Sequence, residues 1–173
     1  DFVYRIAMGE LPYLTGIFPL GSAPTAKSTF DLEGWNLPSS QLTIPADNRS
    51  PGTFLLAVRN EGKLSNPVRF AIDTSPEVLE AAQPNDCAEQ AQHVRIPSVI
   101  DGRIETPDDS DSYVFDGEAG SQIVAEVFAR RLASPANCSL VLEQGGTVCA
   151  YLAAYRSVRG KVTPLHGDFE ATA

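Results

Sequence analysis

The chain has 173 residues, of which 43% are hydrophobic, and its formal net charge is −9. This length suits one large or two small domains, and the hydrophobic share is enough for a packed core. The negative charge repels a phosphate backbone and attracts cations such as calcium, so we expect no nucleic-acid partner. No apolar run approaches the roughly 18–20 residues needed to cross a bilayer, so we expect no membrane span.

Residues 1–10, DFVYRIAMGE, have the alternation of a β-strand. Phe2, Tyr4 and Ile6 alternate with Val3 and Arg5. A lone strand needs a partner, so we expect it to join the following domain or to end a preceding module. The segment has no initiator Met and no signal-peptide pattern, so we expect the chain to be part of a longer protein.

Residues 11–74 contain three apolar runs separated by turn residues. In STFDLEGWNL, Phe30 and Leu32 alternate with polar residues, and GTFLLAVRNEG is almost continuously apolar up to its turn. NPVRFAID places Val68, Phe70 and Ile72 on one face of a strand. Prolines lie between the runs, where strands end. The pattern predicts a small all-β sandwich.

Residues 75–83 change composition toward Glu, Ala, Gln and Pro. We interpret this stretch as a linker between two domains. A short helical turn is possible over 76–82, and Pro84 would end it.

Residues 84–151 return to strand patterns. HVRIPSVIDGRIE predicts two short strands, and SYVFDGEAGSQIVAEVFAR predicts a pair of strands joined at DGEAG. CSLVLEQGGTVCAYL predicts a hairpin around Gly145–Gly146. Residues 152–173 alternate only weakly, and we expect an irregular tail. The fold class predicted for the whole chain is all-β, with two tandem β-sandwich modules behind a stray N-terminal strand.

The three cysteines, Cys87, Cys138 and Cys149, form no CxxC pair, so the sequence does not predict a zinc site. Cys138 and Cys149 flank the last predicted hairpin and could form a disulfide. Free buried thiols are the interpretation that we prefer for all three.

Two stretches resemble known bacterial modules. LPYLTGIFPLG, STFDLEGWNL and LSNPVRFAI are similar to the opening strand, the central signature and the closing strand of an immunoglobulin-like IPT/TIG domain. QPNDCAEQAQ, IDGRIETPDDSDSYVF and GEAGSQIVAEVFA resemble, in order, the entry, core and hairpin of a bacterial pre-peptidase C-terminal domain. The second resemblance implies a jelly-roll-like sandwich in an exported, multi-domain bacterial protein.

This resemblance also implies a calcium site. The matching positions are Asn85 and Asp86 in the entry segment and Asp109 and Asp111 in the acidic turn, with Asp108 as an alternate. Calcium takes six to eight oxygen ligands, which carboxylates, amides and backbone carbonyls can supply. The alternative is a solvated turn whose Asp side chains cap local backbone N–H groups. The family usually has Glu where this chain has Gln83, which removes one negative ligand, and this chain has Asn137 where the family often has Asp.

The sequence offers no pattern of catalytic residues. His93 and His166 are the only imidazoles, no serine lies in a GxSxG pattern, and we expect both histidines at the surface. Trp35, with Tyr13 and Phe18, could stack on a sugar, but we favour a role for Trp35 in covering the edge of the core.

The function predicted from the sequence is that of a non-catalytic accessory, binding or spacer module. Its expected location is extracellular, periplasmic or at the cell surface, with polysaccharide, protein or neighbouring domains as partners. The alternative is part of the catalytic unit of a secreted hydrolase. Fold alone does not decide between the two.

Overall fold

Strands dominate the chain, and its described part contains no helix of seven or more residues. The computed structural model describes residues 1–173 apart from 47, 82–83, 108, 118–121, 145–146 and 154–173, and it does not describe the side chains of 144 and 147–153. The described residues include two short 3-10 turns, η1 (Ala88–Gln90) and η2 (Arg130–Leu132). The predicted all-β fold class is confirmed.

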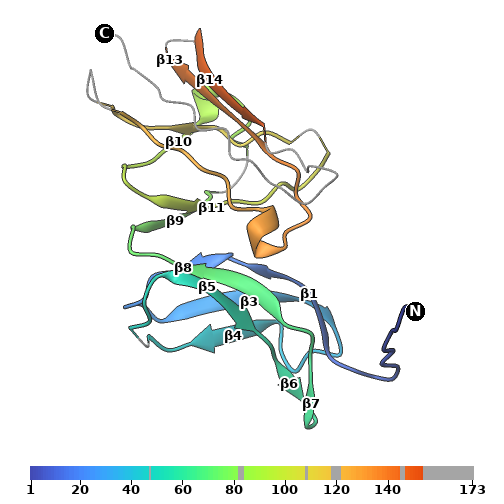
Figure 1. The fold of residues 1–173 in the computed structure, drawn as a ribbon. Helices are drawn as coiled ribbons and strands as arrows, with labels where there is room; N and C mark the ends of the chain where they lie inside the picture. The colour runs from blue at the N-terminus through green and yellow to red at the C-terminus, as the bar shows by residue number, and fades with distance from the viewer. Residues whose placement is uncertain (47, 82–83, 108, 118–121, 145–146, 154–173) are drawn as a thin grey trace.

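Residues 11–74 form two three-stranded sheets and a short hairpin, all in the lower body of Figure 1. The first sheet has the order β1-β3-β4 and is antiparallel, and the second has the order β2-β8-β5. The strands of the first body are β1 (Tyr13–Phe18), β2 (Gly21–Ser22), β3 (Ser28–Trp35), β4 (Gln41–Ile44), β5 (Gly52–Leu56), β6 (Arg59–Asn60), β7 (Lys63–Leu64) and β8 (Val68–Ile72).

One hydrophobic core joins the two sheets of this first body. Phe30 of β3 is fully buried, and its ring meets Phe70 of β8 edge-on, with the ring centroids 5.4 Å apart. The other buried members of the core are Leu14, Ile17, Leu32, Leu56, Val58 and Ile72. Side chains from both sheets therefore fill one interior, as in a sandwich, and the alternation read from STFDLEGWNL and NPVRFAID is confirmed.

In the second body, the described residues form three two-stranded sheets. Two of these pairs are parallel, β9 with β11 and β10 with β12, and the third is the antiparallel hairpin β13–β14. Their bounds are β9 (Glu77–Leu79), β10 (Gln92–His93), β11 (Val99–Asp101), β12 (Tyr113–Val114), β13 (Ser139–Gln144) and β14 (Thr147–Ala153). Among the described residues of this body, the buried hydrophobic side chains are Val94 and Leu132. The jelly-roll-like module in tandem with the first therefore stays a prediction.

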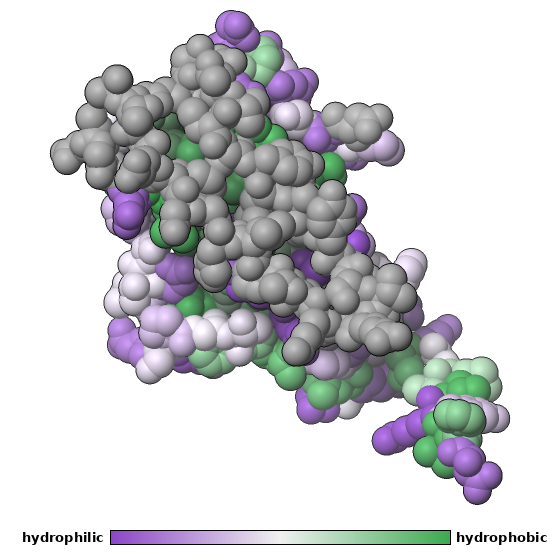
Figure 2. Space-filling view, turned by 45° about the horizontal axis from the view of Figure 1, so that its top comes forward, coloured by the Kyte–Doolittle hydropathy of each residue, from purple (hydrophilic) through white to green (hydrophobic). Residues whose placement is uncertain are grey.

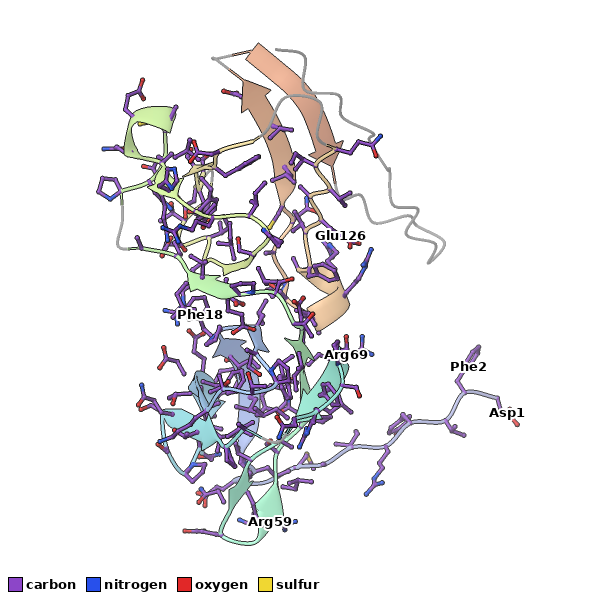
Figure 3. All side chains as sticks on the ribbon, turned by 90° about the vertical axis from the view of Figure 1, so that its left-hand side faces the viewer. Asp1, Phe2, Phe18, Arg59, Arg69 and Glu126 are labelled. Atoms are coloured by element: carbon purple, nitrogen blue, oxygen red, sulfur yellow. The ribbon has the colours of Figure 1, made fainter. Side chains whose placement is uncertain are left out.

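Residues 1–10 do not form the predicted strand. All ten residues are exposed, and Figure 3 shows the segment, with Asp1 and Phe2 labelled, running away from the first body. The alternation of side chains is present, but no other strand of the described chain lies beside this backbone to share hydrogen bonds with it. We call residues 1–8 the N-terminal arm.

The predicted linker contains a strand. Glu77–Leu79 is extended and pairs in parallel with Val99–Asp101, so the helical turn expected over 76–82 does not form. Of the strand pair expected over 113–128, the described residues form β12 and a single bridge at Gln122. The turn expected within that pair lies mostly outside the described residues, as does the tail 154–173.

The predicted hairpin over 138–152 is confirmed, but its possible disulfide is not. Cys138 is a free thiol, and the strand register pairs Ser139 with Ala153. Cys149 therefore lies several positions along its strand from the residue opposite Cys138, too far for a bridge. Cys87 is also a free thiol, but it is exposed rather than buried, which corrects the interpretation made from the sequence.

Candidate functional site

The two acidic segments of the predicted calcium site lie side by side. The backbone N–H of Ser112 donates to the carbonyl oxygen of Asn85 at 2.8 Å, and the N–H of Gln92 donates to the carbonyl of Ser112 at 3.0 Å. These bonds continue into the parallel pairing of β10 with β12. The entry segment around Asn85 is thus next to the acidic turn that precedes Tyr113.

Asn85 lies at the centre of this region. Its side chain is 2% exposed, and its Nδ2 donates to Glu80 Oε1 at 3.0 Å. The other oxygen of that carboxylate, Oε2, accepts the backbone N–H of Arg103 at 2.7 Å. Glu80 therefore ties the entry segment to the end of β11. Sequence reasoning missed Glu80 because it lies in the stretch read as a linker. The signal that could have found it was the apolar pair Val78–Leu79 beside it, which favours a strand.

Asp111 and Tyr113 face the same point, above Gly102. A Cβ atom built on Gly102 would lie 2.9 Å from the Tyr113 hydroxyl, 3.3 Å from Glu80 Oε2 and 3.6 Å from Asp111 Oδ2. Any side chain at this position would displace them. Burial, and then the charges of Glu80, Asp111 and Glu105, raise the pKa of Tyr113, so its hydroxyl keeps its proton. The region is a partly buried acidic cluster with a neutral phenol beside it.

Asp109 has the role that the alternative interpretation gave it, a turn cap. Its Oδ2 accepts the backbone N–H of Glu105 at 2.8 Å, and its Oδ1 accepts that of Ser110 at 3.0 Å. The bond from the Glu105 N–H is the main reason why the pKa of Asp109 is lowered. Asp86 is exposed, and Asp108 lies outside the described residues.

The donor set suits calcium chemically, because it contains only oxygen ligands. Its positions do not complete a coordination shell. Within the part of the chain that the structure describes, no three His, Cys, Asp or Glu side chains are placed to hold a metal ion. The structure brings Asn85 and Asp111 into one region, while Asp109 uses both oxygens on backbone N–H groups and Asp86 lies at the surface.

A second surface feature is an aromatic pair on the first body. Tyr13 of β1 is the register partner of Trp35 of β3, and their ring centroids are 5.9 Å apart. Trp35 is 64% exposed, so it does not cover the core edge as expected. Phe18 is not part of this pair, because its ring lies under the guanidinium of Arg103 at 4.0 Å.

The backbone around Trp35 is held firmly. Gly34 has a φ of +153°, and Asn36 is in the left-handed region with a φ of +53°. Asn36 Nδ2 donates to the carbonyl of Leu11 at 3.0 Å, and Asn60 Nδ2 donates to the carbonyl of Asn36 at 2.9 Å. Trp35 is therefore presented to the surface on a fixed frame.

His93 is at the surface, as predicted, with its Nε2 3.3 Å from Asp116 Oδ2. Its side chain is 59% exposed and that of Asp116 is 95% exposed. His166 lies outside the described residues. Among the described residues, no helix has the length and apolar content to span a membrane.

Comparison of the chain with family models, with curated proteins and with solved structures gives no match.

Proposed function

We propose that the chain is a non-catalytic accessory or spacer module of an exported, multi-domain bacterial protein, and that its N-terminal end docks on a neighbouring domain. The observation that carries this proposal is the exposure of the arm. Phe2, Val3, Tyr4, Ile6 and Met8 are between 67% and 103% exposed. Contiguous exposed apolar side chains mark interaction surfaces, because leaving them in water is unfavourable.

The aromatic pair of Tyr13 and Trp35 also favours this end of the first body as the docking surface. Tyr13 is 49% exposed and Leu64, on the nearby β6–β7 hairpin, is 58% exposed. Lys63 Nζ donates to the carbonyl of Glu10 at 3.2 Å, which ties this hairpin to the base of the arm. Figure 2 shows apolar residues on the segment that projects from the body. An apolar surface of this kind favours a protein partner over a polysaccharide.

The test begins with the coding sequence on both sides of this segment. The chain is then produced with the domain encoded before it, and hydrogen exchange is measured over residues 2–8. We expect slow exchange there, and fast exchange when Val3→Asp and Ile6→Asp are combined. Arg5→Ala is the matched control and should keep the protection. Equally fast exchange in the two-domain protein and in the isolated chain, or the absence of a preceding domain, would contradict the proposal.

The fluorescence of Trp35 can distinguish a protein partner from a sugar ligand. It is the only tryptophan, so the intrinsic fluorescence of the chain reports this surface directly. We expect the emission maximum to shift to shorter wavelength when the preceding domain is attached, because the indole leaves water. A saturable change on titration with chito-oligosaccharides or cello-oligosaccharides would instead favour the polysaccharide ligand.

We further propose that calcium stabilises the second body through Asn85 and Asp111, the two predicted ligands that the structure brings into one region. The support is the adjacency of the two segments and the oxygen chemistry. A ligand that binds only the folded state at about a hundredfold over its Kd adds about 2.7 kcal/mol. Thermal melts in millimolar calcium and in excess chelator should then differ by about 5–10 °C. Asp111→Ala should remove the difference, and Asp116→Ala should keep it. Identical melting curves of the unmodified chain in the two buffers would contradict the calcium site. They would support the alternative, a solvated turn that Asp109 caps.

The alternative function, a part of a hydrolase, has one feature in its favour, the contact of His93 with Asp116. A triad would also need a nucleophile within hydrogen-bond reach of the imidazole. An assay with casein and with p-nitrophenyl acetate tests this alternative. Turnover that is lost in His93→Ala would support the hydrolase and overturn the non-catalytic module.

A further inference from the structure

Two carboxylates of the second body lie at the edge of the first. Asp101, on β11, accepts the backbone N–H of Leu20 on Oδ1 at 2.8 Å. Glu77, on β9, lies beside Gly21, and the backbone near Ala23 lowers its pKa to a small extent. Leu20 comes directly before β2, which is an edge strand of its sheet. Side chains rather than another strand therefore satisfy this edge and join the two bodies.

The two carboxylates face the same spot. The position that a Cβ atom would take on Gly21 lies 3.3 Å from Glu77 Oε1 and 4.0 Å from Asp101 Oδ2. A third carboxylate, Asp73, follows β8 and adds its negative charge. Arg103, which follows β11, is 3.3 Å from Asp31 and thus pairs with that carboxylate. The charged groups that act on Glu77 from the neighbouring elements, Asp101 and Asp73, are both negative.

Burial makes this arrangement unfavourable when every carboxylate is ionised. Asp101 is 7% exposed, and within the described chain its Oδ2 has no hydrogen-bond partner. Burial first, and then the charges of Asp101 and Asp73, raise the pKa of Glu77 to about 7. Burial also raises the pKa of Asp101, although the N–H groups of Leu20 and Gly21 oppose this. Asp101 thus keeps its charge more readily, and Glu77 is the group that takes the proton.

We propose that Glu77 and Asp101 form a proton-operated latch between the two bodies, closed while Glu77 carries a proton and loosened when both are ionised. Protonation of Glu77 removes the repulsion between the two carboxylates, while Asp101 keeps its hydrogen bond from the backbone N–H of Leu20. Protonation of Glu77 therefore stabilises the contact between the two bodies, which we call the joint.

The direction of the pH effect is set by linkage. The pKa of Glu77 in the folded chain, about 7, lies above its ordinary value of 4.5. The closed joint therefore holds the proton more tightly than the open or unfolded chain. Its stabilising contribution is complete below the ordinary value and is lost as the pH rises through about 7. Asp101, with its own pKa raised, changes stability in the same direction.

Energy transfer across the joint tests the latch in the whole chain. Trp35, the only tryptophan, lies in the first body and serves as donor. Cys87 is exposed in the second body and can carry a dansyl acceptor in a background with Cys138→Ser and Cys149→Ser. We expect transfer to fall between pH 5.5 and pH 8.5 with a midpoint near 7, and to fall reversibly.

Two variants and one control make the outcome decisive. Glu77→Gln, which is always neutral, should keep high transfer at pH 8.5. Asp101→Asn, which keeps an acceptor for Leu20, should move the midpoint to lower pH. Glu143→Gln removes an exposed carboxylate on β13 and should behave as the unmodified chain. Circular dichroism at both pH values checks that each variant is folded.

Three results would overturn the latch. The first is transfer that does not change with pH, and the second is a Glu77→Gln variant as sensitive to pH as the unmodified chain. The third is transfer at pH 8.5 that calcium restores and a chelator removes. In that case a cation, not a proton, would neutralise the pair.

Discussion

Neighbouring residues of one strand have opposite roles in the first body. On β5, Leu55 is 65% exposed and Leu56 is 4% exposed. The alternation of a pleated strand produces this contrast without any difference in side-chain chemistry. Substitutions at Leu55 and Leu56 therefore measure how much burial in this core contributes to the free energy of unfolding.

Leu56→Ala should lower the free energy of unfolding by about 2–5 kcal/mol, because it removes buried methyl groups and leaves a cavity. Leu55→Ala is the matched control and should cost no more than about 0.5 kcal/mol. Urea denaturation followed by Trp35 fluorescence measures both. Equal losses in the two variants would show that this strand does not face the core as described.

A second residue-scale prediction concerns Gly34. Its φ of +153° is disfavoured for other residues, and an added Cβ would collide with the backbone carbonyl of Tyr13. Gly34→Ala should therefore cost at least about 2 kcal/mol. At Gly52 an added Cβ would meet only the Phe54 ring at 3.7 Å, so Gly52→Ala is the control and should change stability little. A stable Gly34→Ala variant with unchanged Trp35 emission would argue against the fixed frame around the aromatic pair.

At the scale of elements, the sequence predicts β3, β8 and the short strand β11, misses β9, and predicts strands over residues 1–10 and 123–128 that do not form. β3 and β8 each carry enough alternation to be read directly, and both form. β9 has three residues and pairs in parallel with β11, about twenty residues later. Such a strand is specified by a partner far along the chain rather than by its own pattern. The N-terminal arm is the opposite case, because it has the pattern of a strand but pairs with no strand of the described chain.

The candidate calcium site was predictable to a similar degree. The sequence brings Asn85 and Asp111 into one proposal, and their segments do lie together. It cannot reveal that Asp109 caps the turn, since that role depends on where the N–H groups of Glu105 and Ser110 point. The Glu77–Asp101 pair could not be predicted at all, because it requires β9 and β11 to be neighbours of β2.

An element-scale prediction concerns the segment after β11. Arg103 Nη2 is 3.3 Å from Asp31 Oδ2, and both side chains are close to half exposed. Solvent screens such pairs, so the coupling energy from an Arg103→Ala and Asp31→Ala double-mutant cycle should be less than about 1 kcal/mol. It should shrink further in 0.5 M NaCl. A coupling above about 2 kcal/mol would show that this ion pair, rather than the Glu77–Asp101 latch, dominates the joint.

At the scale of the whole molecule, the two bodies differ in how they are held together. The first has one core shared by two sheets, whereas the described part of the second has separate two-stranded sheets and few buried apolar side chains. The joint contributes hydrogen bonds that link residues far apart in sequence, such as Leu20 to Asp101 and Arg69 to the carbonyl of Arg131. The boundary between the bodies is therefore part of the folded structure rather than a free linker.

This difference predicts the order of proteolysis. Proteases need an extended, unpaired backbone, which the arm offers and β9 does not. Chymotrypsin should cut after Phe2 or Tyr4 well before it cuts after Leu79, although Leu79 is 53% exposed. Mass spectrometry of a time course at pH 6 measures the two rates. At pH 8.5 the latch is open, so cleavage after Leu79 should speed up relative to cleavage in the arm, and Glu77→Gln should suppress that increase. If cleavage after Leu79 at pH 6 is as fast as cleavage in the arm, residues 75–83 form a flexible linker, as the sequence predicts.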